Sequence, residues 1–119
     1  MADHRRALGA AGEAAAARHY EMLGYEIVER NWRNHAGEID LVLADPRVLV
    51  FCEVKTRRTS TFGDPAEAVT WTKQQRLKKL ALGWLDEHSA RGRSLRLDVA
   101  AVIANTDGTF TVEIISDIA

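Results

Sequence analysis

Three ionisable residues lie inside two apolar strand patterns, and they constrain the fold of this chain more than any other feature. The stretch from Gly37 to Lys55 predicts two strands that fold back on each other at residues 45–47, with Asp40 in the first strand and Glu53 and Lys55 in the second. An unpaired carboxylate is costly to desolvate, so acidic residues inside strands are usually paired or bound to a metal. The pattern therefore predicts either a buried ion network or a metal site.

The pairing of these two strands decides whether the three groups meet. A two-residue connection at Asp45-Pro46 would place Asp40 opposite Phe51 and diagonal to Glu53. Opposed residues of an antiparallel pair share a face, and a shift of one residue would send Asp40 to the other face. Asp40, Glu53 and Lys55 therefore share a face only if the residue numbers of each opposed pair add up to an odd number, or if a local bulge restores that face.

Hydrophobic periodicity predicts further elements on both sides of the hairpin. At 119 residues the chain has the size of one domain, residues 1–119. In chain order we expect a helix over Arg5–Leu23, a strand over Tyr25–Trp32, the central hairpin, a short helix over Asp64–Val69, a helix from a Thr72 capping box to about His88, a strand over Leu95–Ala104, and a strand over Thr109–Ile115 after a turn at Asp107-Gly108.

The first helix carries an acidic residue close to its expected packing face. Glu13 lies at the border of that face, beside Gly9, Ala16 and Tyr20, where small residues would let the helix approach a neighbouring element. A solvated Glu13 and a functional Glu13 both fit this position. The residues expected on the packing face itself are Leu8, Ala11, Gly12, Ala15, His19, Met22 and Leu23.

Composition favours a cytoplasmic protein. No segment approaches the roughly 20 apolar residues that span a bilayer, so we expect no membrane partner. The single cysteine, Cys52, cannot form an internal disulfide and is expected to be a small core residue. The net charge of −1 is not that of a typical nucleic-acid binder, but seven basic and only three acidic residues fall between Glu53 and Leu80.

That basic segment begins at the end of the second central strand. The loop from Thr56 to Gly63 is rich in hydroxyls and guanidiniums, groups suited to phosphate contacts, although an ordinary polar loop has the same composition. Lys73 is expected to point from its helix toward the sheet. A further strand acid, Asp98, has Arg96 two residues away as a structural partner. The cations that we expect to contact nucleic acid are Arg33, Arg57, Arg58, Lys73 and Arg76.

An aspartate and a glutamate on adjacent strands, without histidine or cysteine ligands, make an all-oxygen site. Such a site suits Mg²⁺ or Mn²⁺ better than Zn²⁺. A carboxylate-held Mg²⁺ commonly binds phosphate oxygens, which indicates phosphodiester chemistry. Lys55 would then either stabilise charge on the phosphorus or help to deprotonate water, and the spacing does not separate these roles.

Short motifs run through nearly the whole chain around these acids. They are Leu8-Gly9 with Gly12-Glu13, Gly24-Tyr25, Arg30-Asn31-Trp32-Arg33, Gly37-Glu38-Ile39-Asp40-Leu41-Val42, Val50-Phe51-Cys52-Glu53-Val54-Lys55-Thr56-Arg57, Lys73 and Arg96-Leu97-Asp98-Val99. This set closely resembles the YraN family of small bacterial proteins. That family is similar to PD-(D/E)XK restriction-endonuclease-like nucleases and archaeal Holliday junction resolvases.

The resemblance implies an α/β (α+β) fold with an αβββαβ core, a mixed central sheet flanked by helices, and here a C-terminal hairpin strand. It implies that Glu13, Asp40, Glu53 and the Val54 carbonyl hold the metal, and that Lys55 is the catalytic lysine. Ile39 precedes Asp40 where the superfamily motif has proline.

Two functions remain open at this point. The first is a Mg²⁺- or Mn²⁺-dependent endonuclease acting on DNA rather than RNA, including branched structures, for which a homodimer would supply two active sites. The second is a nucleic-acid-binding or adaptor module without catalysis on the same fold. A structural ion network of Asp40, Glu53 and Lys55 is the third interpretation, and the roles of Glu38 and Asp98 stay undecided.

Overall fold

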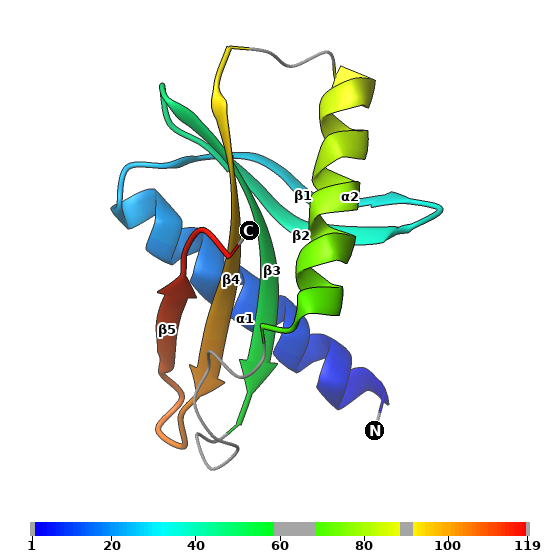
Figure 1. Ribbon diagram of the computed structural model, residues 1–119. Helices are drawn as coiled ribbons and strands as arrows, with labels where there is room; N and C mark the ends of the chain where they lie inside the picture. The colour runs from blue at the N-terminus through cyan, green and yellow to red at the C-terminus, as the bar shows by residue number, and fades with distance from the viewer. Residues whose placement is uncertain (1, 59–68, 89–91, 119) are drawn as a thin grey trace.

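The computed structural model describes residues 2–58, 69–88 and 92–118. Every helix and strand expected in these ranges is present, while the short helix expected over Asp64–Val69 lies, except for Val69, outside them. The elements are α1 (Ala2–Met22), β1 (Glu26–Asn34), β2 (Gly37–Ala44), β3 (Val48–Arg57), α2 (Trp71–His88), β4 (Ser94–Ala104) and β5 (Phe110–Ile115) (Figure 1).

The strands form one mixed sheet in the order β1-β2-β3-β4-β5. Strands β3 and β4 are parallel, and the other neighbouring pairs are antiparallel. Helix α2 supplies the crossover between the two parallel strands, as such a connection requires. The observed order confirms the αβββαβ core with an added hairpin strand, β5, and it agrees with a restriction-endonuclease-like fold.

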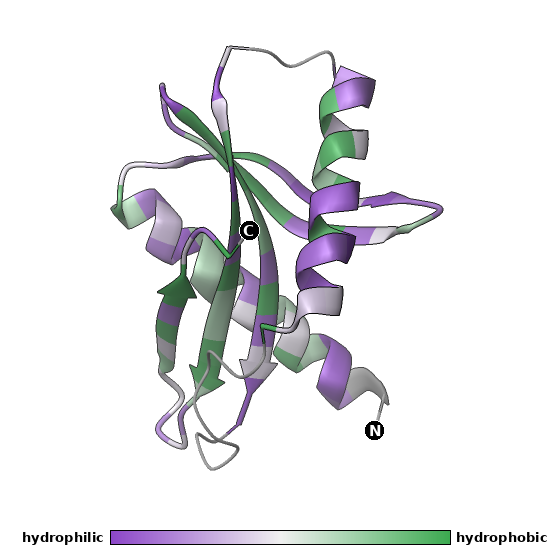
Figure 2. Cartoon of the chain, viewed as in Figure 1, coloured by the Kyte–Doolittle hydropathy of each residue, from purple (hydrophilic) through white to green (hydrophobic). Residues whose placement is uncertain are grey.

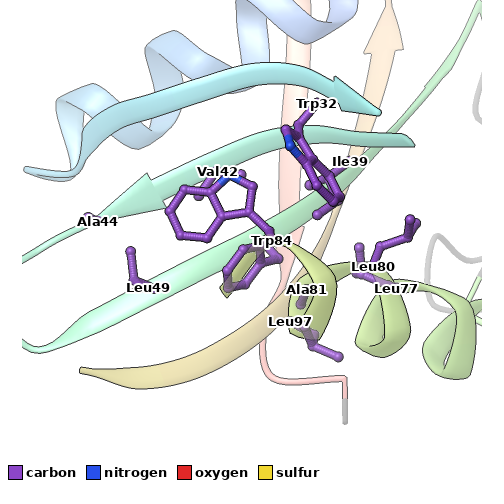
Figure 3. Close-up of a cluster of buried hydrophobic side chains, with 11 residues drawn as sticks. Trp32, Ile39, Val42, Ala44, Leu49, Leu77, Leu80, Ala81, Trp84 and Leu97 are labelled. Carbon is purple, nitrogen blue, oxygen red and sulfur yellow. The ribbon is translucent and has the colours of Figure 1, made fainter. Parts of the chain in front are cut away.

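The two helices cover opposite faces of the sheet (Figure 1). Apolar residues concentrate on the central strands β3 and β4 (Figure 2). On one face the stripe Leu77, Leu80, Ala81 and Trp84 of α2 packs in one cluster with Phe51, as its spacing predicted. Figure 3 shows the stripe beside Val42, Leu49 and Leu97 of the same cluster. On the other face α1 packs over a second cluster, which contains Ala16, Ala17, Tyr20, Leu41, Leu43, Val50, Cys52, Ala100 and Val102.

The packing face predicted for α1 was partly wrong. Met22 and Leu23 are 82% and 60% exposed, and the face that is buried instead passes through Gly12, Ala16 and Tyr20. In an alanine-rich helix the apolar contrast around the axis is weak, so it does not fix the packing face. Close approach at the small residues fixes it instead, together with a hydrogen bond from Tyr20 to Asp98.

The start of α2 also differs from the prediction. Thr70 Oγ1, rather than Thr72, accepts the hydrogen bond from the Lys73 backbone nitrogen at 3.2 Å, so Thr70 is the N-cap. Lys73 is partly buried, and the direction of its side chain toward the sheet stays a prediction. None of the helices in the described ranges is long and apolar enough to cross a membrane.

The chain reverses at residues 45–47 as predicted, but the expected two-residue connection is wrong. Ala44 pairs with Leu49, two positions beyond the expected partner. The reason is the Asp45 carboxylate, whose Oδ1 accepts hydrogen bonds from the backbone nitrogens of Arg47 and Val48 at 2.7 and 2.8 Å and so holds a wider turn. The residue numbers of each opposed pair still add up to an odd number, as a shared face required.

Candidate active site

Strands β2 and β3 separate at Asp40. Their pairing covers only Leu41–Ala44 of β2, whereas β2 pairs with β1 from Gly37 to Ala44. Just beyond the last pair with β3, Asp40 Oδ2 accepts a hydrogen bond of 2.7 Å from the backbone nitrogen of Val54. The Asp40 carboxylate therefore satisfies a β3 amide at the point where the two strands diverge.

The alternation of side chains along β2 is broken at the same point. Ile39 and Val42 both pack in the cluster under α2, although they are an odd number of residues apart, while Leu41 packs in the cluster under α1. A regular strand would place Ile39 and Leu41 on one face. The irregularity turns Asp40 toward β3 and α1 instead of into either apolar cluster.

Helix α1 brings Glu13 to this place because Gly12 has no side chain. A Cβ atom on Gly12 would lie 1.9 Å from Thr56 Oγ1 of β3, so helix and strand touch through the glycine. The helix therefore approaches a neighbouring element closely, as predicted, but at Gly12 and not at Gly9, where an added Cβ would meet nothing within 4 Å. Burial raises the pKa of Glu13, and the nearby charge of Glu38 raises it further, while Asn31 and Arg30 counteract these effects.

Asn31, which lies on the neighbouring strand β1, connects two of the acids. Its backbone has a φ of 52°, a left-handed conformation that asparagine tolerates better than most residues. With its amide nitrogen turned toward the acids, it donates to Glu38 Oε1 at 2.8 Å and to Glu13 Oε1 at 2.9 Å. Sequence reasoning missed this role, although Asn31 stood in the Arg30-Asn31-Trp32-Arg33 motif.

These acids shift the titration of Asp40. Burial is the main cause that raises its pKa to about 7, the negative charges of Glu13, Glu38 and Glu53 add to the rise, and the hydrogen bond from Val54 opposes it. Mutual repulsion of carboxylates in a partly desolvated place is typical of catalytic and metal-binding sites. We therefore take Glu13, Glu38, Asp40 and Glu53, which come from α1, β2 and β3, as the acidic site.

Glu53 lies on a different side of this arrangement from Glu13 and Asp40, so the odd sum of the Leu41–Ala44 pairs did not bring Asp40 and Glu53 to the shared face that the sequence predicted. It follows Phe51 by two residues on β3 and lies on the α2 face, where its Oε1 is 2.5 Å from Nη2 of Arg76. Lys55 is exposed two residues further along β3. Within the part of the chain that the structure describes, no three histidine, cysteine or acidic side chains are grouped closely enough to hold a metal ion.

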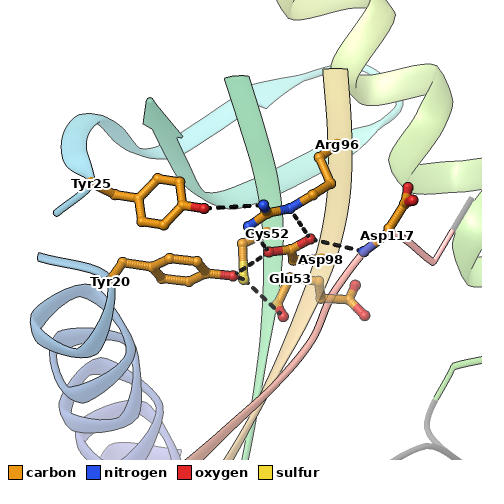
Figure 4. Close-up of polar contacts among 7 residues, drawn as sticks. All are labelled: Tyr20, Tyr25, Cys52, Glu53, Arg96, Asp98 and Asp117. Carbon is orange, nitrogen blue, oxygen red and sulfur yellow. Dashed lines mark hydrogen bonds and ion pairs between the residues drawn. The ribbon is translucent and has the colours of Figure 1, made fainter. Parts of the chain in front are cut away.

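Asp98 belongs to a separate, saturated network on the α1 face. Its carboxylate is fully buried and accepts hydrogen bonds from Arg96 at 3.0 and 2.9 Å, from Tyr20 at 2.8 Å and from the Asp117 backbone at 3.1 Å (Figure 4). The pairing with Arg96 confirms the sequence prediction, whereas the Tyr20 and Asp117 contacts were not foreseen. Asp98 is therefore a structural residue that joins α1, β4 and the C-terminal segment.

Comparison with known proteins agrees with this arrangement of motifs. The family model described as "Uncharacterised protein family UPF0102" matches residues 12–102, a range that contains all four acids of the site. The chain belongs to the UPF0102 family. This is the YraN family that its motifs resemble.

Three UPF0102 proteins illustrate the similarity. One from Beutenbergia cavernae is 52% identical over 107 residues, covering 90% of this chain and 91% of its own length. One from Rhodococcus opacus is 51% identical over 100 residues, covering 84% and 85%. One from a Nocardioides species is 47% identical over 109 residues, covering 92% and 88%.

Two of the cations predicted to bind nucleic acid are paired with acids of the site in this UPF0102 chain. Arg33 Nε lies 3.3 Å from Glu38 Oε2, and Arg76 pairs with Glu53. Arg57 and Arg58 are exposed at the end of β3. Beside the acids lies a hollow of about 520 Å³, which is lined by Arg6, Gly9, Ala10, Glu13, Asn31, Arg33 and Glu38.

Cys52 is a buried free cysteine, which confirms its expected place in the core. Burial raises the pKa of its thiol. A thiol that resists ionisation is a poor nucleophile and a poor metal ligand, so Cys52 does not extend the acidic site, although its strand neighbour Glu53 belongs to it.

Proposed function

We propose that this chain hydrolyses phosphodiester bonds of DNA in a reaction that depends on Mg²⁺ or Mn²⁺. The observation that carries the proposal is the position of Asp40, a partly buried carboxylate whose pKa is raised to about 7 by burial and by three neighbouring acids. Burial of like charges costs free energy that a divalent cation would recover. Asp40 lies where β2 and β3 separate, and Lys55 is exposed on β3.

The chemistry of the expected donors, though not a ready grouping of three described side chains, suits a hard divalent cation. Glu13, Asp40, Glu53 and the Val54 carbonyl offer only oxygen atoms, the ligands that Mg²⁺ and Mn²⁺ prefer. The bound cation would supply charge neutralisation at the phosphate and acidification of a water. In the structure the Val54 amide holds Asp40, and Asn31 holds Glu13 and Glu38, so three of the acids are oriented by their own hydrogen bonds.

The chain's own residues have distinct roles in this proposal. Lys55, exposed on β3 two residues after Glu53, would stabilise the negative charge that develops on the phosphate. Glu13 presents a carboxylate with a raised pKa, which suits it to accept a proton from an attacking water. Arg57, Arg58 and Lys73 offer cations for the phosphates of the bound strand.

A second candidate function is nucleic-acid binding without catalysis. The ion pair between Arg76 and Glu53 favours it, because this pair engages an expected ligand, and no three-ligand group occurs within residues 2–58, 69–88 and 92–118. In both proposals DNA is the partner, and a homodimer would suit a branched substrate with two scissile strands.

The test is cleavage of branched, single-stranded and duplex DNA in the presence of Mg²⁺ or Mn²⁺. Wild type should cleave at least one substrate, and Asp40→Asn and Lys55→Ala should abolish cleavage. Lys78→Ala, which removes an exposed cation from α2, is the matched control and should keep most of the activity. If wild type cleaves no substrate that both site variants fail to cleave, only the binding function is left.

Binding itself has a separate test. The affinity of the protein for labelled duplex DNA should fall steeply with salt, by about 0.9 in the log-log slope for each phosphate contacted. A flat salt response would argue against a nucleic-acid partner. Sedimentation of the protein with and without a branched substrate would show whether two chains assemble on it.

A further inference from the structure

Arg76 makes a contact that its expected role as a DNA-binding residue does not explain. Its Nη2 atom lies 2.5 Å from Oε1 of Glu53, which joins the second turn of α2 to β3. Glu53 is also close enough to Asp40 for its charge to raise the pKa of that residue. The guanidinium is therefore bound to one of the carboxylates that are expected to hold the metal.

We infer that Arg76 is an internal counter-ion that holds Glu53 in the metal-free protein and releases it when a divalent cation binds, after which its guanidinium contacts the DNA backbone. This inference rests on the proposed function, because it assigns Glu53 to the metal. It makes Arg76 a positioning residue that couples metal binding to DNA binding.

The exposure of the pair permits such an exchange. The Arg76 side chain is 50% exposed and the Glu53 side chain 21% exposed. A partly exposed ion pair contributes little net stability, because both groups are well solvated when apart. Arg76 also lies outside the buried stripe of α2, so its departure from Glu53 would open no cavity in the core.

The chemistry of the two partners supports the direction of the exchange. The guanidinium engages Oε1 of Glu53 at 2.5 Å and neutralises part of the charge that this carboxylate would offer a metal, so the two cations compete for Glu53. A divalent cation beside Asp40 and Glu53 offers Glu53 a higher charge than Arg76 does. A released guanidinium remains charged and matches a phosphate through two parallel hydrogen bonds.

The inference predicts effects of opposite sign on two ligands. Arg76→Ala removes a competitor for Glu53, so Mn²⁺ should bind roughly two- to fivefold more tightly, the range expected for a partly exposed pair. The same variant should bind DNA less tightly when Mn²⁺ is present, with a log-log salt slope smaller by about 1. A residue that only stabilised the fold would lower both affinities.

Mn²⁺ binding is measured without DNA, from the electron paramagnetic resonance signal of free Mn²⁺. Wild type is compared with Arg76→Ala, Arg76→Gln and the matched control Lys78→Ala, which loses the same charge from an exposed position of α2. Binding to a labelled oligonucleotide is measured by fluorescence anisotropy in a Lys55→Ala background, which keeps the DNA intact. Arg76→Gln keeps the length of the side chain and guards against a folding defect in Arg76→Ala.

Tighter Mn²⁺ binding together with weaker DNA binding, in Arg76→Ala and Arg76→Gln but not in Lys78→Ala, would support the exchange. If wild type binds Mn²⁺ and neither Arg76 variant binds it more tightly, the exchange is wrong while the proposed nuclease function stands. If wild type binds no Mn²⁺, both the metal-dependent function and the exchange are overturned.

Discussion

The carboxylate of Asp40 accepts a hydrogen bond of 2.7 Å from the backbone nitrogen of Val54. This bond joins the residue expected to be the central metal ligand to the residue whose carbonyl was expected to complete the metal shell. It also explains why a buried acid is tolerated between β2 and β3, because Asp40 satisfies an amide of β3 beyond the last pair with β2.

Asp40 should make the metal-free protein less stable as the pH rises. Its folded pKa of about 7 lies above the ordinary aspartate value of 3.8, so the folded state binds the proton more tightly than the unfolded state does. The resulting destabilisation is absent below about pH 4 and complete above about pH 7, where it amounts to something on the order of 4 kcal/mol. Asp40→Asn keeps an acceptor for Val54 and should be more stable than wild type at pH 8 in EDTA, but equal to it near pH 4.

Thermal unfolding from pH 4 to pH 8 in EDTA and in Mn²⁺ checks this prediction. Mn²⁺ should raise the melting temperature of wild type and leave Asp40→Asn nearly unchanged. Asp86→Asn, at an exposed position of α2, is the control and should show no such pH-dependent gain. If Asp40→Asn loses roughly 3 kcal/mol or more at pH 8, Asp40 belongs to a structural ion network instead.

Gly12 should be far less tolerant of a side chain than Gly9. An added Cβ at Gly12 would meet Thr56 Oγ1 at 1.9 Å, whereas nothing lies within 4 Å of a Cβ at Gly9. Gly12→Ala should therefore destabilise the protein by about 1–3 kcal/mol and displace Glu13 from the other acids. Gly9→Ala should be neutral or stabilise the helix by about 0.5–1 kcal/mol.

Chemical denaturation of the two glycine variants, with Mn²⁺ binding as a second readout, separates these outcomes. Gly12→Ala should lose Mn²⁺ affinity even where the protein is fully folded, because Glu13 has moved. Equal stabilities for Gly9→Ala and Gly12→Ala would show that α1 does not touch β3 through Gly12.

Asn31 combines a backbone requirement with a hydrogen-bonding one. Asn31→Gly removes the donations to Glu13 and Glu38 but keeps the left-handed backbone, whereas Asn31→Ala removes the donations and adds strain at a φ of 52°. The alanine variant should be less stable than the glycine variant by about 1 kcal/mol. Both variants should need more Mn²⁺ for half-saturation than wild type, and a glycine variant with wild-type affinity would argue that Asn31 does not orient the acids.

The contrast between β3 and α1 shows what the sequence determines and what it leaves open. The strand pattern with Glu53 and Lys55 was strong enough to predict the hairpin, because alternation with period two leaves few choices, but the odd pairing sum was only a condition for a shared face. The wider turn at Asp45 could not be predicted, since it depends on one carboxylate accepting from two backbone nitrogens. The packing face of α1 depends on Tyr20 meeting Asp98, two residues far apart in the chain.

The same reasoning applies to the acidic site. The separation of β2 from β3 at Asp40 and the ion pair between Arg76 and Glu53 are tertiary features that no local pattern encodes. Short motifs indicated which acids to examine, but the partners of those acids come from α1, β1 and α2. Sequence reasoning could therefore name the acids to examine, but it could not predict the contacts among them.

Asp98 should be essential for folding without any direct effect on metal binding. Its fully buried carboxylate accepts from Arg96, Tyr20 and the Asp117 backbone. Asp98→Ala leaves the guanidinium of Arg96 without this carboxylate and should cost about 3–5 kcal/mol. Tyr20→Phe removes one neutral donor to a charged acceptor and should cost about 1.5–3 kcal/mol.

A double-mutant cycle over Tyr20→Phe and Asp98→Asn measures the coupling between the two residues by urea denaturation, with Mn²⁺ affinity determined for each folded variant. We expect a coupling energy of about 1 kcal/mol or more, because the residues share one hydrogen-bond network. The Mn²⁺ affinity of Tyr20→Phe should equal that of wild type. A large loss of Mn²⁺ affinity in that variant, with stability preserved, would instead place the network of Asp98 within the functional site.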